Sequence, residues 1–269
     1  MGNVVLITGT STGIGRALAL QAANAGHQVV ATMRDTSRAG ELADVADVRA
    51  LDVTSAESVA ELIAGVLRDH GRIDVLVNNA GAGHVGTVET DSVEDFQAVL
   101  DVNLLGVVRM TKAAMPHLRA SRGRLVTVSS VGGVVGQPFN EAYCAAKFAV
   151  EGMMESLAPV AAQFGVRVSL VEPGAVATEF VANAVTDRAA LLAGMGDYRP
   201  VLERYVARTE AAFAAAQSAE EVAAVVLSVV ESEAPALRYQ TSDRAREFVG
   251  VKLADLDGSR VLGVTSGMC

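Results

Sequence analysis

A short apolar run near the start of the chain leads directly into a glycine-rich turn, and this feature constrains the fold most. The run Val4–Ile7 is entirely apolar, as expected for a strand buried on both faces, and Thr8–Gly15 places three glycines at G-x3-G-x-G spacing before a helical pattern reaching about Ala25. Glycines let the backbone turn tightly and approach a pyrophosphate, which the free N–H groups of a helix N-terminus attract. Because the spacing differs from the G-x-G-x-x-G fingerprint, the turn predicts either a relative of the dinucleotide-binding motif or a tight connection only.

Apolar runs and amphipathic segments alternate along the rest of the chain. Strands are predicted at Gln28–Thr32, Val48–Val53, Asp74–Asn78, Arg124–Ser129, Gly165–Val171 and Ala236–Tyr239. Helices are predicted at Ser55–Asp69, Val93–Leu118, Ala142–Gln163 and Ser218–Glu231. Regular alternation of this kind indicates an α/β fold with a doubly wound parallel sheet of the Rossmann type, flanked by helices. Since no linker or repeat interrupts the series, residues 1–269 are expected to form a single domain.

The segment 179–216 has a different character and is predicted to be a helical insertion. Its apolar residues look exposed: Phe180, Leu191, Leu192, Met195, Tyr198, Tyr205 and Phe213. Two interpretations stay open, a lid over an apolar substrate and a contact between subunits.

Charge and composition exclude several classes of function. A formal net charge of −9 and a pI near 5.0 argue against a nucleic-acid or anionic-membrane surface, because both require basic patches. Four scattered histidines and two cysteines without a C-x-x-C motif indicate neither a metal site nor a disulfide framework. The N-terminal sequence lacks the pattern of a signal peptide or membrane segment, so a cytoplasmic protein is expected.

A serine, a tyrosine and a lysine are predicted to meet at the edge of the sheet. On a helix, Tyr143 and Lys147 lie one turn apart on the same face, where an ammonium favours the phenolate and lowers the pKa of the tyrosine. Ser130 follows a predicted strand, and ligands of α/β proteins bind where strands end. Together the three groups describe proton transfer to or from a carbinol oxygen, although Tyr and Lys four residues apart are also common on ordinary surface helices.

Residues after the second and third predicted strands bear on the adenosine end of a dinucleotide. Arg34 follows the second strand, and a guanidinium suits the 2′-phosphate of NADP(H), whereas Asp35 is either a ribose-binding acid or a helix cap. Arg34 could alternatively be only solvated. Asp52, at the end of the third strand, is a candidate acceptor for the adenine amino group.

Three amides are also expected to have specific partners. Asn78 and Asn79 end the fourth strand, where they either tie strand ends together or bind a ligand. Asn103 stands among apolar residues of a predicted helix, and a buried amide is costly unless it is hydrogen-bonded. Its partner is therefore either structural or part of a proton path.

These motifs, in this order and at these separations, resemble the short-chain dehydrogenase/reductase family. The similarity spans roughly residues 3 to 240 and rests on Thr8-Gly9-x3-Gly13-Ile14-Gly15, Asn78-Asn79-Ala80-Gly81, Asn103, Ser130, Tyr143-x3-Lys147 and Pro173-Gly174. The run from Ser129 to Gly152, with Ala31–Asp35, is most similar to the 17β-hydroxysteroid and retinol dehydrogenase branch. Glu172, where many members have a neutral residue, and Pro159, which should kink or shorten its helix, depart from the pattern.

The resemblance implies a role for each matching residue. Tyr143 would be the general acid/base, Lys147 would lower its pKa and bind the nicotinamide ribose, Ser130 would bind the substrate carbonyl, and Asn103 would anchor a relay water. The implied cofactor-binding positions are Gly9, Ser11, Gly13, Ile14 and Gly15 for the pyrophosphate, Asp52 and Val53 for adenine, Asn79 and Gly81 for the adenosine ribose, and Pro173, Gly174, Val176 and Thr178 around the nicotinamide. A homodimer or homotetramer formed through the long helices is also implied.

The sequence therefore predicts an NADP(H)-dependent oxidoreductase that interconverts a ketone or aldehyde and an alcohol on an apolar, steroid- or retinoid-like or polycyclic substrate. Candidates for the substrate wall are Val135, Phe139, Asn140, Phe180 and Met195, which could equally be core residues. A 3-oxoacyl-thioester reductase shares the same residues and remains an alternative, although the predicted lid is not notably basic. A regulatory protein that senses NADP(H) without turnover is the non-enzymatic alternative.

Overall fold

The computed structural model describes residues 2–180, 187–213, 216–252 and 255–259, and parallel strands form one sheet across them. The strands are β1 (Val4–Thr8), β2 (Gln28–Met33), β3 (Asp47–Ala50), β4 (Val75–Asn78), β5 (Arg124–Val128), β6 (Arg167–Glu172) and β7 (Arg238–Gln240), in the order β3-β2-β1-β4-β5-β6-β7. The order reverses between β1 and β4. At such a switch point the carboxyl ends of the strands leave a crevice for a ligand. The predicted doubly wound sheet is confirmed.

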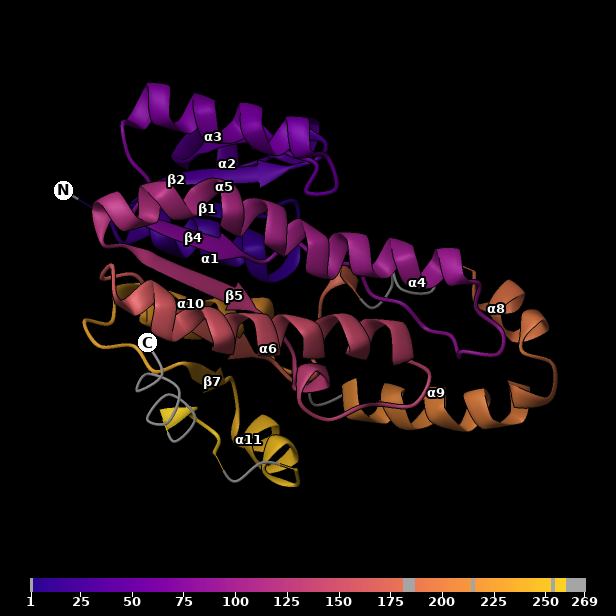
Figure 1. Ribbon diagram of the computed structural model, residues 1–269. Coiled ribbons are helices and arrows are strands. Elements are labelled where there is room, and N and C mark those ends of the chain that lie inside the picture. The colour runs from indigo at the N-terminus through magenta and orange to yellow at the C-terminus, as the bar shows by residue number, and fades with distance from the viewer. Residues whose placement is uncertain (1, 181–186, 214–215, 253–254, 260–269) are drawn as a thin grey trace.

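Helices cover both faces of this sheet (Figure 1). The helices are α1 (Gly13–Asn24), α2 (Leu42–Val45), α3 (Ala56–His70), α4 (Val93–Leu100), α5 (Gly106–Ser121), α6 (Glu141–Ala162), α8 (Arg188–Gly194), α9 (Arg199–Phe213), α10 (Ala219–Glu231) and α11 (Asp243–Gly250). Helices α3, α5 and α6 bury apolar residues on one face, and α1 and α10 bury theirs on the other. Ser55 and Ser218 cap α3 and α10, as their positions before the apolar patterns predict.

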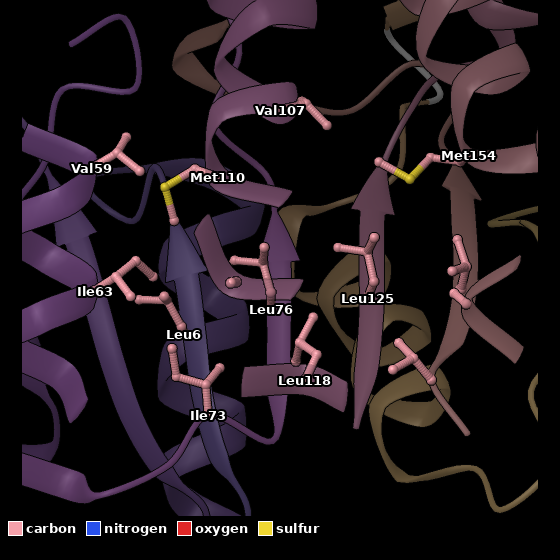
Figure 2. Packing of buried hydrophobic residues seen from close by; sticks show 14 of the residues in the cluster. Leu6, Val59, Ile63, Ile73, Leu76, Val107, Met110, Leu118, Leu125 and Met154 are labelled. Carbon is pink, nitrogen blue, oxygen red and sulfur yellow. The ribbon is translucent and has the colours of Figure 1, made fainter. Parts of the chain in front are cut away.

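A row of apolar side chains crosses the sheet and forms the centre of one core. The register pairs Leu6 with Leu76 and Leu76 with Leu125, and all three are 0% exposed. Figure 2 shows them between residues of the covering helices, such as Ile63 of α3 and Met110 of α5. Burying one such side chain stabilises the fold by about 1.5–3 kcal/mol, so this row holds the switch point rigid.

One long predicted helix is interrupted by a π-helical segment. The prediction ran from Val93 to Leu118, whereas the chain forms α4, a π-helical turn over Asp101–Leu105, and α5, which continues to Ser121. Within the turn, Gly106 N–H bonds to Asp101 O, five residues back. Asn103 lies in this turn, which frees its side chain to bind a neighbouring loop.

The end of β3 differs from the prediction, and Pro159 does not shorten its helix. Strand β3 ends at Ala50 and not at Val53, because the Asp52 carboxylate accepts hydrogen bonds from the Thr54 N–H (2.9 Å) and hydroxyl (2.7 Å) and turns the chain. Pro159 lies inside α6, which ends at Ala162, close to the predicted end.

The predicted helical insertion contains α8, a short 3-10 helix (Gly196–Tyr198) and α9. They lie beyond the end of the sheet to which the strand arrows point (Figure 1, orange). Positions 181–186 and 214–215 of the predicted lid are outside the described residues. In the described parts of the chain, no helix is both long and apolar enough to span a membrane.

Candidate active site

The glycine turn between β1 and α1 has room for nothing larger than hydrogen at two positions. Gly9 has φ +71°, and a Cβ there would lie 2.8 Å from Ala80 Cα. A Cβ on Gly15 would lie 2.3 Å from Gly9 O and 2.4 Å from Asn79 Nδ2. The Asn79 amide donates to Thr8 O and Gly9 O, at 2.9 Å each, so Asn79 ties the β4 end to the turn. Of the two roles left open for it, the structural one is observed.

The N-terminus of α1 is open to an anion. Thr12 occupies the N-cap position in an extended conformation, and its side chain makes no capping hydrogen bond. The first N–H groups of α1 therefore lack the protein acceptor that a capping side chain provides elsewhere in this fold. Thr178 lies directly over this turn, since a Cβ on Gly13 would lie 3.2 Å from its Cγ2. Ser11, Gly13 and Thr178 thus come together, as a cofactor site spanning these segments requires.

Around the end of β2, Arg34 makes no ion pair among the described residues, although its charge acts on Asp52, while Asp35 and Arg38 are engaged. Arg34 is exposed, and among the described residues no carboxylate forms an ion pair with it. Asp35 caps the 3-10 helix Thr36–Arg38 by accepting from the Ser37 N–H (3.0 Å) and hydroxyl (2.7 Å), which lower its pKa. Of its two open roles, Asp35 therefore takes that of a cap. Arg38, which the sequence did not single out, pairs with Glu179 at 3.2 Å.

The predicted adenine and nicotinamide residues lie at the same sheet edge. The Asp52 carboxylate is engaged by Thr54, which lowers its pKa, and Val53 packs against the core under α5. After β6, Pro173 O accepts from Val131 N–H at 3.0 Å, and Val176 bridges to Gln217 beside Gly174. These contacts fix the loop that follows β6 against the loop that follows β5.

Ser130, Tyr143 and Lys147 converge at the carboxyl end of β5, as predicted. Ser130 precedes the short 3-10 helix Val131–Gly133, and its hydroxyl accepts from Gly132 N–H at 3.0 Å and also bonds with the Tyr143 hydroxyl. Lys147 Nζ donates to Val128 O at 2.9 Å and lies 5.8 Å from the centroid of the Tyr143 ring. Helix α6 supplies the tyrosine and the lysine from adjacent turns of one face.

The electrostatics of this group differ from the expectation that Lys147 lowers the pKa of Tyr143. Burial raises the pKa of Tyr143 to about 12, and the hydrogen bond with Ser130 opposes this only in part. Burial also lowers the pKa of Lys147 to about 8, while Glu151 acts in the opposite direction. Both shifts have the same cause, because removal from water disfavours each charged form. In this structure Tyr143 is therefore a protonated donor at neutral pH.

Asn103 is fully buried and has a structural partner. Its Oδ1 accepts from Ala82 N–H at 2.9 Å and its Nδ2 donates to Ala82 O at 2.8 Å. A Cβ on Gly81 would lie 2.9 Å from Asn103 Oδ1, so the glycine permits this contact. The pair holds the loop after β4 against the π-helical turn.

The candidate substrate-wall residues separate into two groups. Phe180 lies edge-on to Tyr143, with ring centroids 5.9 Å apart. Phe139 and Met195 instead form a small core with Leu202 beneath α8 and α9, and Phe139 stacks on Tyr205 at 5.5 Å. The Asn140 amide donates to the Tyr205 hydroxyl at 2.7 Å. Val135 packs against the cluster that includes Val249 of α11. Of these candidates, Phe180 is the one whose ring packs on Tyr143.

Sequence reasoning missed residues whose partners are distant in the chain. Tyr205 fastens α9 to the loop before α6, and Arg238 of β7 binds Glu151 of α6. The spacing Tyr143, Lys147, Glu151, at four-residue intervals, was the available signal for Glu151.

Comparisons with known proteins agree with this geometry. The family described as short chain dehydrogenase matches residues 3–189. The chain is 41% identical over 271 residues to 17-beta-hydroxysteroid dehydrogenase type 1 of Mus musculus, covering 95% of this chain and 78% of that protein. It is 41% identical over 277 residues to retinol dehydrogenase 8 of Bos taurus, covering 95% and 86%. A solved alcohol dehydrogenase from Thermococcus sibiricus, complexed with 5-hydroxy-NADP, superposes with a TM-score of 0.74 at 26% identity, covering 89% of this chain and 96% of that one.

The chain belongs to the short-chain dehydrogenase family. It is an oxidoreductase that acts on CH–OH or C=O groups, and it uses a nicotinamide cofactor.

Proposed function

We propose that the protein is an NADP(H)-dependent oxidoreductase that interconverts an apolar ketone or aldehyde and its alcohol through Ser130, Tyr143 and Lys147. The observation that carries this proposal is the convergence of these three side chains at the carboxyl end of β5, beside the uncapped N-terminus of α1.

The residues present fit a dinucleotide. The turn carries no side chain at Gly9, Gly13 and Gly15, which leaves its backbone uncovered, and the N–H groups at the start of α1 lack a side-chain cap. Gly9, Gly13 and Gly15 would admit the pyrophosphate, Thr178 would contact the nicotinamide end, and the exposed guanidinium of Arg34 would bind a 2′-phosphate. The bound cofactor supplies or accepts the hydride.

The chain's own residues carry out the proton transfer to and from the substrate oxygen. In the direction of reduction, Ser130 donates a hydrogen bond to the substrate oxygen and Tyr143 transfers its proton to the same oxygen. Because burial keeps the pKa of Tyr143 near 12, the phenol is available as a donor over the whole neutral range. In the direction of oxidation the phenolate must form, and the ammonium of Lys147 is the nearest charge that would stabilise it.

An apolar substrate is supported by the surroundings of Tyr143. Phe180 packs on its ring, and the insertion above the site rests on a wholly apolar cluster around Phe139, Met195 and Leu202. The relatives named for 17-beta-hydroxysteroid and retinol dehydrogenase activities favour a steroid- or retinoid-like molecule. We interpret the segment 179–216 as a lid over the Ser130–Tyr143–Lys147 site.

Assembly through the long helices stays a prediction of the family resemblance. An open groove of about 260 Å³ between α5 and α6 supports it, because its lining is almost entirely apolar. The groove is lined by Val108, Thr111, Lys112, Met115, Met153 and Leu157. A homodimer or homotetramer would cover this surface.

The test is oxidation of NADPH and NADH with a panel of a 17-ketosteroid, retinal, an acetoacetyl thioester and an aryl ketone. Tyr143→Phe removes the proton donor and keeps the ring, so turnover is expected to fall about 10²–10⁴-fold while NADPH binding persists. Tyr239→Phe is the matched control, since Tyr239 lies on β7 and its hydroxyl accepts from the N–H of Ala236, in the segment that precedes that strand. Turnover of the thioester alone would favour an acyl-thioester reductase instead. NADPH binding without reduction of any carbonyl in a widened panel would contradict the proposal and favour a sensor.

A further inference from the structure

Helix α6 carries more than the tyrosine and lysine on the face that meets the sheet. Glu151 and Glu155 follow Lys147 at intervals of four residues, so the four side chains form one stripe along the helix. Lys147 is 5% exposed and Glu151 is 6% exposed. An ammonium and a carboxylate are thus buried one turn apart, next to the candidate proton donor.

The Glu151 carboxylate is held by an arginine from the last strand. Arg238 of β7 is 6% exposed, and its Nε donates to Glu151 Oε2 at 3.1 Å. The same guanidinium also binds Glu155 and lies 3.4 Å from Glu172 Oε1. Removing one member of a buried ion pair leaves an uncompensated charge in the protein interior, which is strongly destabilising. The charged groups of this network therefore depend on one another.

The Glu151 carboxylate also meets the Ser129 hydroxyl at the end of β5. Oε1 is buried and makes no hydrogen bond of ordinary geometry, and the neighbouring Ser129 hydroxyl is in the same state. A Cβ on Gly133 would lie 2.8 Å from Ser129 Oγ, 3.0 Å from Glu151 Cγ and 3.1 Å from Lys147 O. The glycine therefore lets the strand end, the lysine turn and the glutamate pack together. Arg238 and Lys147 are the cations that face this carboxylate.

We propose that Glu151 is a positioning residue for the Ser130–Tyr143–Lys147 site: fixed by Arg238, it serves as the buried counter-charge that keeps Lys147 in its ammonium form. This role rests on the proposed function, because it matters only if Lys147 must be charged beside Tyr143. A neutral Lys147 could not stabilise the Tyr143 phenolate needed for alcohol oxidation.

The direction of the electrostatic effects agrees with this role. Burial lowers the pKa of Lys147 to about 8, which is close to neutral pH, and the charge of Glu151 opposes this lowering. Burial raises the pKa of Glu151, while Ser129, Arg238 and Lys147 oppose that rise. Without the carboxylate, the pKa of Lys147 would therefore drop further and the amine would be neutral over more of the neutral range.

Few other charges reach this part of α6 from the elements packed on it. The segment Val131–Gly133 carries no charged side chain, and the one charge of β5 is Arg124, at the opposite end of that strand from Lys147. The other packed elements carry Arg167 and Glu172 of β6, Glu94 and Asp95 of α4, Arg238 of β7 and Asp101 of the π-helical turn, which pairs with Arg109 at 2.7 Å. Of these groups and those of α6, Glu151 is the one whose charge acts on Lys147.

The chain makes a direct measurement possible because it contains only three lysines, Lys112, Lys147 and Lys252. The protonation of Lys147 can be followed by NMR of lysine-labelled protein as a function of pH, with Lys147→Arg to assign its signal. In Glu151→Gln the Lys147 midpoint is expected to fall by on the order of one unit. An unchanged midpoint in a folded variant would overturn the proposal.

Glu155→Gln is the matched control. Glu155 lies on the same stripe and binds the same Arg238, but it stands two turns from Lys147. Its variant is expected to leave the Lys147 midpoint unchanged, and a shift equal to that of Glu151→Gln would mean that the network acts only through packing. If Glu151→Gln does not fold, Glu151→Asp tests the same point, because retracting the carboxylate should lower the midpoint part of the way. A Glu151→Asp midpoint identical to that of the unmodified protein would then refute the role.

The titration needs no turnover, so its outcome is separate from that of the carbonyl panel. A shifted Lys147 midpoint in a protein that reduces no carbonyl would contradict the proposed function and leave the counter-charge role standing. Where turnover is found, we expect the pH above which alcohol oxidation is lost to be lower in Glu151→Gln than in the unmodified protein. The pH profile of Glu155→Gln should match that of the unmodified protein.

Discussion

Replacing Arg34 by alanine should weaken NADPH binding and leave NADH binding nearly intact. Arg34 is exposed and unpaired among the described residues, while Asp35 is occupied by Ser37. A hydrogen bond to a charged group contributes about 1.5–3 kcal/mol, and exposure to solvent moves the value toward the lower end of that range. A loss of about 1.5–2 kcal/mol corresponds to roughly 10–30-fold in affinity.

Fluorescence titration with NADPH and NADH measures both affinities on the same preparation. NADH lacks the 2′-phosphate, so its dissociation constant should change less than about threefold, and the NADPH effect should shrink as salt screens the charges. Arg38→Ala is the control, because Arg38 is already paired with Glu179 at 3.2 Å. Equal losses for both nucleotides in Arg34→Ala would refute a contact with the 2′-phosphate.

Two further predictions concern stability. Asn103→Ala should lower the free energy of unfolding by about 1–3 kcal/mol in urea titrations, because it leaves the half-buried N–H and C=O of Ala82 without their side-chain partner; a change below about 0.5 kcal/mol would contradict this. Glu172 has a pKa raised from 4.5 to about 7, mainly by burial, so its protonated form stabilises the fold at low pH and that stability is lost as pH rises toward 7. The shift corresponds to up to about 3 kcal/mol of folding free energy. The melting temperature of Glu172→Gln should therefore depend less on pH between 5 and 7.5 than that of the unmodified protein. Equal pH dependence of the two proteins would contradict the titration of a buried Glu172 in this range.

The parts of the fold that local sequence patterns dictate were predictable. Fully apolar runs such as Val4–Ile7 identify buried parallel strands, and Ser55 and Ser218 mark helix starts. Tyr143 and Lys147 could be placed together because a four-residue spacing on a helix is a local fact. The end of β3 was misplaced, since a side-chain turn at Asp52 overrides the apolar pattern that continues through Val53.

The rest depends on contacts between distant segments. Phe139 and Met195 read as candidates for a substrate wall, but they are 6% and 3% exposed in a core that only the folded insertion creates. The pKa of Tyr143 could not be inferred from its neighbour alone, because burial in the folded protein raises it and only the hydrogen bond with Ser130 opposes that rise. Arg238 is separated from Glu151 by 87 residues, and no local pattern predicts that pairing.

The π-helical turn at Asp101–Leu105 allows one continuous helix to serve two partners. Before it, Val99 of α4 packs on the start of α6, and after it, Met110 of α5 packs on the sheet. One residue of an α-helix corresponds to about 100° of rotation, so the extra residue in the turn re-aims the apolar stripe between these two surfaces. Deleting a single residue here would put the two halves of the helix out of phase. This stretch is therefore sensitive to its length as well as to the loss of Asn103.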